Sequence, residues 1–175
     1  MQVEDGRGRA FAARADPQPP DRGAQRLARP RAARRRRAPF APAATFVIAV
    51  DTSVWIAAFR GKRATRLPLE HLLDAGEVAL PAPVRIEILA GSSRADLPRL
   101  RRSLAALPVL YPTESTWARI DGFVDHAVAR SQRFGFADLL IAALAAENDC
   151  AVWSLDADFE RLHKLGLVRV SDGGS

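Results

Sequence analysis

The sequence contains a single cysteine, Cys150, which excludes an intramolecular disulfide framework and a zinc site built from several cysteines. It has no uninterrupted apolar run near the ~18 residues that cross a bilayer, so no membrane-spanning helix and no membrane partner are expected. What remains, 48% hydrophobic and 26% charged residues among 175, is the composition of one globular domain. We therefore expect a soluble protein, most simply cytoplasmic.

The basic character of the chain is concentrated at its beginning. The net charge is +6, but residues 1–44 hold eleven arginines and four acids, while residues 45–175 hold 15 basic and 16 acidic residues. The part expected to fold is therefore nearly neutral. Overall basicity is accordingly no argument for a nucleic-acid-binding fold.

Residues 1–44 form a leader in which Ala, Arg, Pro and Gly supply 32 of 44 positions. Its six prolines break any helix and its apolar content is low, so we expect disorder. It lacks the apolar centre of a secretory signal and the serines of a transit peptide. Three interpretations stay open. The leader is an over-extended reading frame of a G/C-rich genome with Val47 as an alternative start, a disordered tail, or a basic arm that binds nucleic-acid phosphates through residues 31–37.

From residue 45 onward, short apolar runs typical of buried strands alternate with helical patterns. Strands are expected at 45–50, 78–80, 109–111, 151–154 and 167–170. Helices are expected at 54–59, 67–73, 83–89, 95–107, 116–130, 137–146 and 158–165, the first of them capped by Thr52 or Ser53. This alternation predicts an α/β fold over residues 45–175, a three-layer sandwich with a central, mostly parallel sheet.

Acidic residues occupy several positions where carboxylates are unusual. Asp51 ends the first strand, and Glu87 lies in an apolar helix. Asp138 begins the most apolar helix, while Asp156 and Asp158 follow the fourth strand. Converging carboxylates repel one another, and a hard divalent cation such as Mg²⁺ or Mn²⁺ would offset that repulsion. Simpler structural interpretations are also open, namely helix-dipole contact, helix capping or plain exposure, and Asp51 is the hardest to explain in this way.

Four motifs surround these acids: VDTSVWI at 50–56, IEILAG at 86–91, FADLLIAA at 136–143 and SLDADF at 154–159. In this order, with 36, 51 and 18 residues between successive acids, they resemble the motifs of PIN-domain ribonucleases, and most closely VapC-type toxins of bacterial toxin–antitoxin pairs. The resemblance covers about residues 46–170. It implies a catalytic, metal-binding quartet made of Asp51, Glu87, Asp138 and Asp156. It also implies Asp158 as a weaker candidate metal ligand, and the hydroxyls of Ser53 and Ser154 as auxiliary groups.

The resemblance implies an Mg²⁺- or Mn²⁺-dependent endoribonuclease whose products carry a 5′-phosphate and a 3′-hydroxyl. Because His71, His126 and His163 lie outside the acidic motifs, a histidine-based ribonuclease is not expected. RNA phosphates would be held by two basic clusters that flank the acids, although each cluster is equally well a solvated charged face. The residues of these clusters are Arg60, Lys62, Arg63, Arg130 and Arg133.

Two partners also follow from the resemblance: a cognate antitoxin, and a second copy of the chain in a homodimer. The antitoxin is expected in a groove of the first two helices, near Trp55, Phe59, Leu69 and Leu72. Three alternatives stay open, namely a PIN nuclease of RNA processing or repair, an inactive acidic α/β binding module, and a different Mg²⁺ phosphohydrolase. The last usually has a second Asp two residues after the strand-end Asp, and this chain has Ser53 there.

Overall fold

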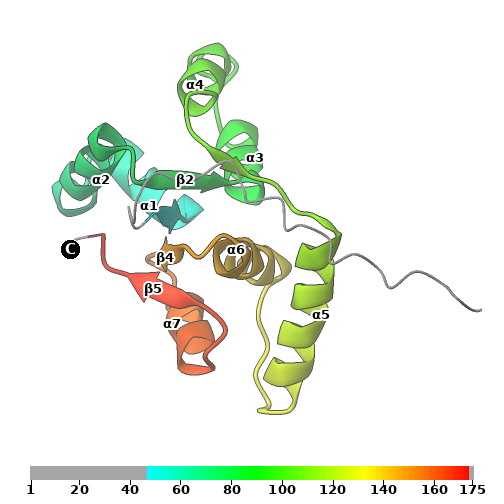
Figure 1. Cartoon of the computed structure of the whole chain (residues 1–175). Coiled ribbons are helices and arrows are strands. Elements are labelled where there is room, and N and C mark those ends of the chain that lie inside the picture. Colours follow the sequence, from blue (N-terminus) through cyan, green and yellow to red (C-terminus); the bar gives the residue numbers. More distant parts are fainter. Residues whose placement is uncertain (1–46, 174–175) are drawn as a thin grey trace, which may run out of the picture. The chain divides into compact units, whose positions relative to one another are not determined.

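The structure, a computed structural model, describes residues 47–173; the leader predicted at 1–44 lies outside the described residues. Five strands form one sheet in the order β3-β2-β1-β4-β5, and every neighbouring pair is parallel. Figure 1 shows the sheet between the helices. The strands are β1 Ile48–Val50, β2 Val78–Pro81, β3 Val109–Leu110, β4 Ala151–Trp153 and β5 Arg169–Ser171. The prediction of a parallel central sheet is therefore confirmed.

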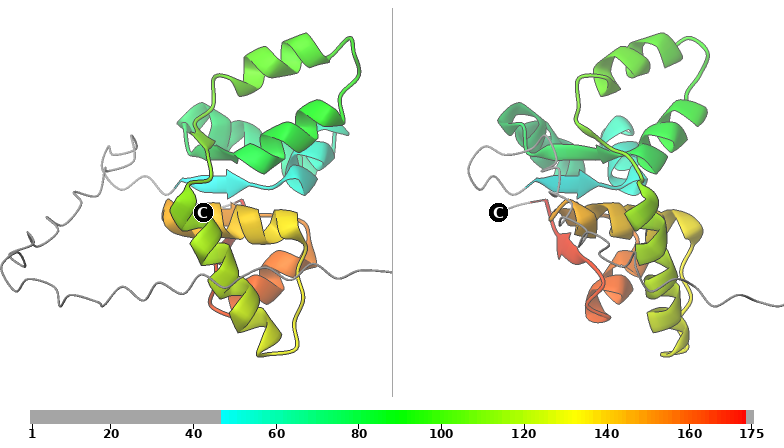
Figure 2. Two further views of the ribbon diagram at one scale, coloured as in Figure 1. Left: turned by 90° about the vertical axis from the view of Figure 1, so that its right-hand side faces the viewer. Right: turned by 45° about the vertical axis from the view of Figure 1, so that its right-hand side comes forward.

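The helices cover both faces of this sheet. They are α1 Thr52–Phe59, α2 Arg63–Ala75, α3 Ala82–Ala90, α4 Leu97–Leu104, α5 Glu114–Val128, α6 Phe136–Glu147 and α7 Ala157–Lys164. The crossovers through α1 to α4 carry the chain toward one edge of the sheet and those through α5 to α7 carry it back, so right-handed connections place the two groups on opposite faces. Figure 2 shows these two helical layers, and the predicted three-layer sandwich is confirmed.

Helices α2 and α4 differ most from the sequence prediction. Helix α2 begins at Arg63, four residues before the predicted start, and contains Pro68 in its interior. Its N-cap residue, Lys62, makes no side-chain capping hydrogen bond, so no local signal marked this start. Helix α4 covers only the middle of the predicted 95–107 segment.

The core is centred on α6, β1 and β4. Every residue from Leu139 to Ala145 of α6 is buried, which confirms the prediction of a central buried helix. Its alanines let the helix lie close to the sheet, where β1 and the end of β4 are buried as well. No helix within residues 47–173 is long and apolar enough to cross a membrane.

The strand order determines where a site can form. β1 and β4 are neighbours, but the chain leaves β1 toward one edge of the sheet and leaves β4 toward the other. Helices that start from such a pair diverge to opposite faces and open a crevice at the carboxyl ends of the strands. Asp51 follows β1 directly, and the segment from Ser154 to Asp156 follows β4.

Candidate functional site

Asp51 sits where a buried strand turns into a helix. It is the N-cap of α1, and its Oδ2 accepts a hydrogen bond of 3.1 Å from the backbone N–H of Ser53. The prediction that Thr52 or Ser53 caps this helix is wrong, because the helix begins at Thr52, two residues before the predicted start, and Asp51 itself binds the free N–H. The Asp51 side chain is thereby fixed in a buried position.

Two serine hydroxyls hold the same carboxylate oxygen. Ser53 Oγ donates to Asp51 Oδ2 at 2.6 Å and Ser154 Oγ donates to it at 2.8 Å. Each hydroxyl also accepts a backbone N–H beyond β4, from Leu155 to Ser53 Oγ at 2.9 Å and from Asp156 to Ser154 Oγ at 3.0 Å. The two serines therefore join the turn after β1 to the turn after β4. In the part of the chain that the structure describes, no hydrogen bond reaches Asp51 Oδ1.

Two further acids stand at the start of α7. Asp156 is exposed and caps this helix, its Oδ1 accepting the N–H of Asp158 at 2.9 Å. The half-buried Asp158 carboxylate accepts a hydrogen bond from Arg161 Nη1 at 2.6 Å within an ion pair. Asp156 thus has the capping role that was one of its simpler interpretations. The cap uses only Oδ1 of its carboxylate.

Asp138 lies in the first turn of α6 and is half-buried. Burial, together with the negative charges of Asp156, Asp158 and Asp51, raises the pKa of its carboxyl from the ordinary 3.8 to about 6, while a backbone hydrogen bond from Gly135 opposes the rise. Acids of two other segments therefore lie near enough to Asp138 to act on its charge.

The absence of a side chain at Gly135 leaves space for the Asp138 carboxylate. A Cβ on Gly135 would lie 2.8 Å from Asp138 Oδ2, closer than carbon and oxygen approach without displacement. Gly135 is also the N-cap of α6, so the carboxylate folds back over the free backbone N–H groups of the helix start.

Glu87 lies on α3, in the helical layer on the opposite face of the sheet from α6 and α7. It is exposed on α3, and the Thr52 hydroxyl donates a hydrogen bond to its Oε2. Thr52 follows Asp51 directly, so this bond ties Glu87 to the strand-end turn. Glu87 is not among the acids whose charge raises the pKa of Asp138.

The donor set suits a hard cation although the carboxylates are not gathered around one point. Within residues 47–173, no group of three or more acidic, histidine or cysteine side chains is arranged as a metal site. The donors are nevertheless carboxylate oxygens with surplus negative charge, as the raised pKa of Asp138 records. Mg²⁺ and Mn²⁺ prefer such oxygens, so the chemistry of these residues fits a divalent ion.

The predicted RNA-binding residues are all exposed and lie in two groups. Arg60, Lys62 and Arg63 lie at the corner between α1 and α2, while Arg130 and Arg133 lie in the segment before α6. No ion pair to any of the five occurs among the residues that the structure describes. Their cations are thus open to solvent.

The predicted antitoxin groove is only partly accessible. Trp55 and Leu69 are buried in the core and Leu72 is half-buried, so Phe59 is the most accessible of the four predicted residues. Phe59 is 56% exposed, and Ile56 and Leu67 add further exposed apolar surface on α1 and α2. The accessible apolar surface of this helix pair is therefore made by other residues than most of those predicted.

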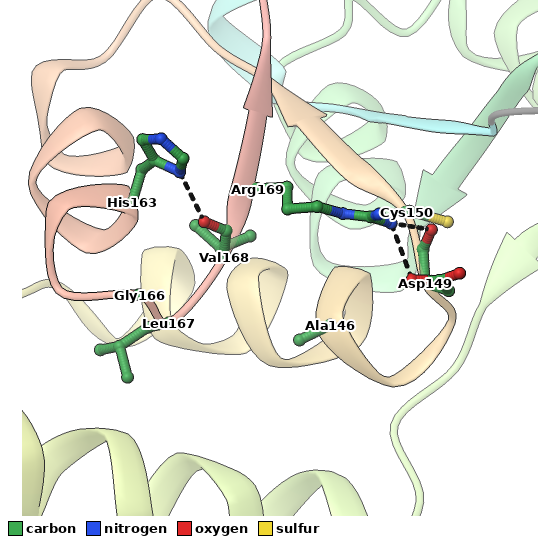
Figure 3. Close-up of a pocket in the computed structure, with 8 residues that line it drawn as sticks. All are labelled: Ala146, Asp149, Cys150, His163, Gly166, Leu167, Val168 and Arg169. Atoms are coloured by element: carbon green, nitrogen blue, oxygen red, sulfur yellow. Dashed lines mark hydrogen bonds and ion pairs between the residues drawn. The ribbon is translucent and has the colours of Figure 1, made fainter.

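A cavity of about 300 Å³ lies at the opposite end of the sheet from the acids (Figure 3). It opens beside the amino ends of β4 and β5, and its lining includes Cys150, His163 and the ion pair of Asp149 with Arg169. Burial raises the pKa of the Cys150 thiol to about 11, which makes it a poor nucleophile. None of the predicted site residues lines this cavity.

Two residues that bond the acids, Thr52 and Arg161, were not predicted from the sequence to do so. The bond from Thr52 to Glu87 joins residues 35 positions apart, and no local pattern signals it. Arg161 lies three residues after Asp158 on the same helix, a spacing that brings side chains together and offered a signal.

Comparison with known proteins relates this chain to a family and to solved structures. The PIN domain family model matches residues 48–165, and no curated protein sequence gives a significant match. Among solved structures, the chain is similar to VapBC2 from Rickettsia felis bound to a DNA fragment from its promoter, with 17% identity and a TM-score of 0.61 over 72% of this chain and 98% of that one. It is also similar to VapBC-1 from nontypeable Haemophilus influenzae, with 16% identity and a TM-score of 0.60 over 73% and 98% of the two chains. FitAcB from Neisseria gonorrhoeae gives 19% identity and a TM-score of 0.58 over 73% and 98%.

At these identities the likeness to solved structures is one of fold. The family match, in contrast, spans most of the chain and contains all four acidic motifs. The chain therefore belongs to the PIN domain family, a family of nucleases.

Proposed function

We propose that the protein is a metal-dependent endoribonuclease toxin of the VapC type, kept inactive by a cognate antitoxin. The observation that carries this proposal is that Asp51, Asp156 and Asp158, which follow β1 and β4, lie near enough to Asp138 for their charges to raise its pKa. An α/β domain without a cation or substrate there would gain stability from neutral residues at these positions. Family membership and the likeness to toxin–antitoxin complexes support the same conclusion.

Asp51, Glu87, Asp138 and Asp156 are the residues that would hold Mg²⁺ or Mn²⁺. The ion would lower the pKa of the attacking water and neutralise charge that develops on the phosphate. Asp158 is the weakest candidate ligand because Arg161 already pairs with its carboxylate.

The chain's own groups prepare this site. Ser53 and Ser154 bind one oxygen of Asp51 and so orient the other toward the crevice. The exposed arginines beside the acids hold RNA phosphates on either side of the anionic centre. No histidine takes part, since among the described residues His163 bonds the Val168 carbonyl at the far end of the sheet and His71 and His126 lie on α2 and α5.

Two partners belong to this proposal. The antitoxin would cover the exposed apolar side chains of Ile56, Phe59 and Leu67 on α1 and α2. A second copy of the chain would cover exposed apolar side chains of α5 and the start of α6, where Trp117 stacks on Phe136 with ring centroids 6.1 Å apart. A toxin–antitoxin complex from Klebsiella pneumoniae is among the similar structures, which supports the first partner.

The test is incubation of the purified full chain with total RNA, with and without Mg²⁺, followed by mapping of the cut ends. We expect Mg²⁺-dependent cuts that leave 5′-phosphate and 3′-hydroxyl ends. Absence of cutting under every metal tested would favour the alternative of an inactive acidic binding module. Cutting without growth arrest on expression in a bacterial host would favour a nuclease of RNA processing over a toxin.

A further inference from the structure

The segment at 129–135, which connects α5 to α6, is held by few hydrogen bonds of its own, although its Phe134 packs against the core. Figure 2 shows it as a long connection without helix or strand, which leads directly to the start of α6. Its own hydrogen bonds are helix-end turns, such as those from Ser131 N–H and Gln132 N–H back to Val128 and Ala127. Ser131 adopts φ 55, the left-handed conformation that residues with a Cβ disfavour. Such a segment needs an outside contact to keep one conformation.

Arg161 of α7 supplies that contact. Its Nε and Nη2 donate to Gln132 Oε1, the former at 3.1 Å, and Nη2 also donates to the Arg133 carbonyl oxygen at 3.3 Å. The guanidinium carbon lies 4.7 Å from the centroid of the Phe134 ring, in a cation–π contact. Among the described residues, Arg161 makes every hydrogen bond between this segment and α7.

The same guanidinium is anchored on an acid of the site. Arg161 Nη1 bonds Asp158 Oδ1 at 2.6 Å, with both side chains half-buried. A planar fork with five donors can serve a carboxylate, an amide oxygen and a carbonyl at once, which a lysine ammonium cannot do with fixed geometry. One oxygen of the Asp158 carboxylate is thus engaged by Arg161.

We propose that Arg161 is a positioning residue of the acidic site: it fastens segment 129–135 to α7, with Asp158 as its anchor, and so fixes Asp138 relative to Asp156. Asp138 follows this segment by three residues, and Asp156 caps the helix that carries Arg161. The fastening also sets where Arg130 and Arg133 stand along the crevice. The inference rests on the proposed nuclease function for its effect on catalysis, but the fastening itself does not depend on that function.

Hydrogen exchange of the full-length protein tests the fastening without any nuclease assay. In Arg161→Gln and in Gln132→Ala, backbone amides of residues 130–137 should exchange about tenfold faster than in the wild type, because the segment opens locally. Arg169→Gln is the matched control, since Arg169 also pairs with an aspartate, at 2.8 Å, but at the far end of the sheet. Gln132→Ala serves if Arg161→Gln fails to fold. Exchange in both variants equal to that of the control would overturn the proposal.

Cleavage kinetics test the effect of the fastening on catalysis. Arg161→Gln should lower kcat about tenfold and raise KM for RNA, because both an acid and the phosphate-binding arginines lose their positions. Hydrogen exchange tests the anchor: Asp158→Asn keeps an acceptor for Arg161, so amides of residues 130–137 should exchange more slowly in it than in Asp158→Ala. Equal exchange in the two Asp158 variants would overturn the assignment of Asp158 as an anchor. If the wild type shows no cleavage but the segment loosens as expected, the proposed function fails and the fastening stands.

Discussion

The hydroxyl of Ser154 donates a hydrogen bond of 2.8 Å to Oδ2 of Asp51 across 103 positions of sequence. A bond of this kind to a buried charged group contributes about 1.5–3 kcal/mol, and here it also decides which carboxylate oxygen faces the crevice. It is one of the contacts that join the turn after β1 to the turn after β4.

We expect Ser154→Ala to lower stability by about 1–2 kcal/mol, because Asp51 loses one donor and the Asp156 N–H loses its acceptor. RNA cleavage should fall with it, since Asp51 is less well oriented. Urea unfolding and initial cleavage rates measure the two effects. Ser103→Ala, an exposed serine on α4, is the control. Unchanged stability and rate in Ser154→Ala would show that the contact does not orient Asp51.

Asp51→Asn should reduce RNA cleavage at least about a hundredfold, because it removes a carboxylate that the metal and the attacking water both require. In chelator, the same variant should be at least as stable as the wild type, since one charge leaves a repulsive cluster. The comparison variant is Asp74→Asn on the exposed surface of α2. An Asp51→Asn protein as active as Asp74→Asn would refute the role of Asp51.

Chelation separates a metal enzyme from a metal-free one. EDTA should stop cleavage, and Mg²⁺ or Mn²⁺ should restore it. The ions should also raise the melting temperature of the wild type more than that of Asp51→Asn, because a ligand that binds only the folded state stabilises it. Full turnover in EDTA would rule out the metal mechanism.

The sequence was sufficient to predict the elements and the acids but not the contacts between them. The apolar strand runs and the helix α6 are local patterns, and the structure has them where they were expected. The burial of Trp55 and Leu69 was not predictable in this way, because an apolar helix does not by itself reveal which side faces the sheet.

The partners of the acids lie far away along the chain. Ser154 bonds Asp51 and Thr52 bonds Glu87 only because β1, β4 and α3 are brought together by the fold. Arg161 lies a turn from Asp158, yet its second contact, Gln132, comes from another element 29 positions away. Periodicity and motif spacing carry no information on such pairs, which depend on the packing of the finished sheet.

Removal of residues 1–44 should leave RNA cleavage intact. All the residues to which we assign roles lie between Asp51 and Arg161, and residues 45–175 are nearly neutral on their own. Cleavage rates of the full chain and of the 45–175 fragment, compared at two salt concentrations, measure this. A large loss in the fragment at low salt that shrinks at high salt would show that the leader is an RNA-binding arm.

The raised pKa of Asp138 predicts how the unfolding free energy changes with pH, including the direction of the change. Its pKa is about 6 in the folded protein and near 3.8 in the unfolded chain, so the folded state binds the proton more tightly. The charged carboxylate therefore destabilises the fold fully above pH 6, and this penalty disappears as the pH falls from 6 to below 4. Asp138→Asn lacks the charge at every pH. Its gain in unfolding free energy over the wild type, measured with urea in EDTA, should be largest at pH 8 and should shrink toward pH 4.

The control for the loss of one negative charge is Asp125→Asn, which changes an exposed acid on α5. A gain that is independent of pH, or one that Asp125→Asn matches, would show that Asp138 is not held among the other acids.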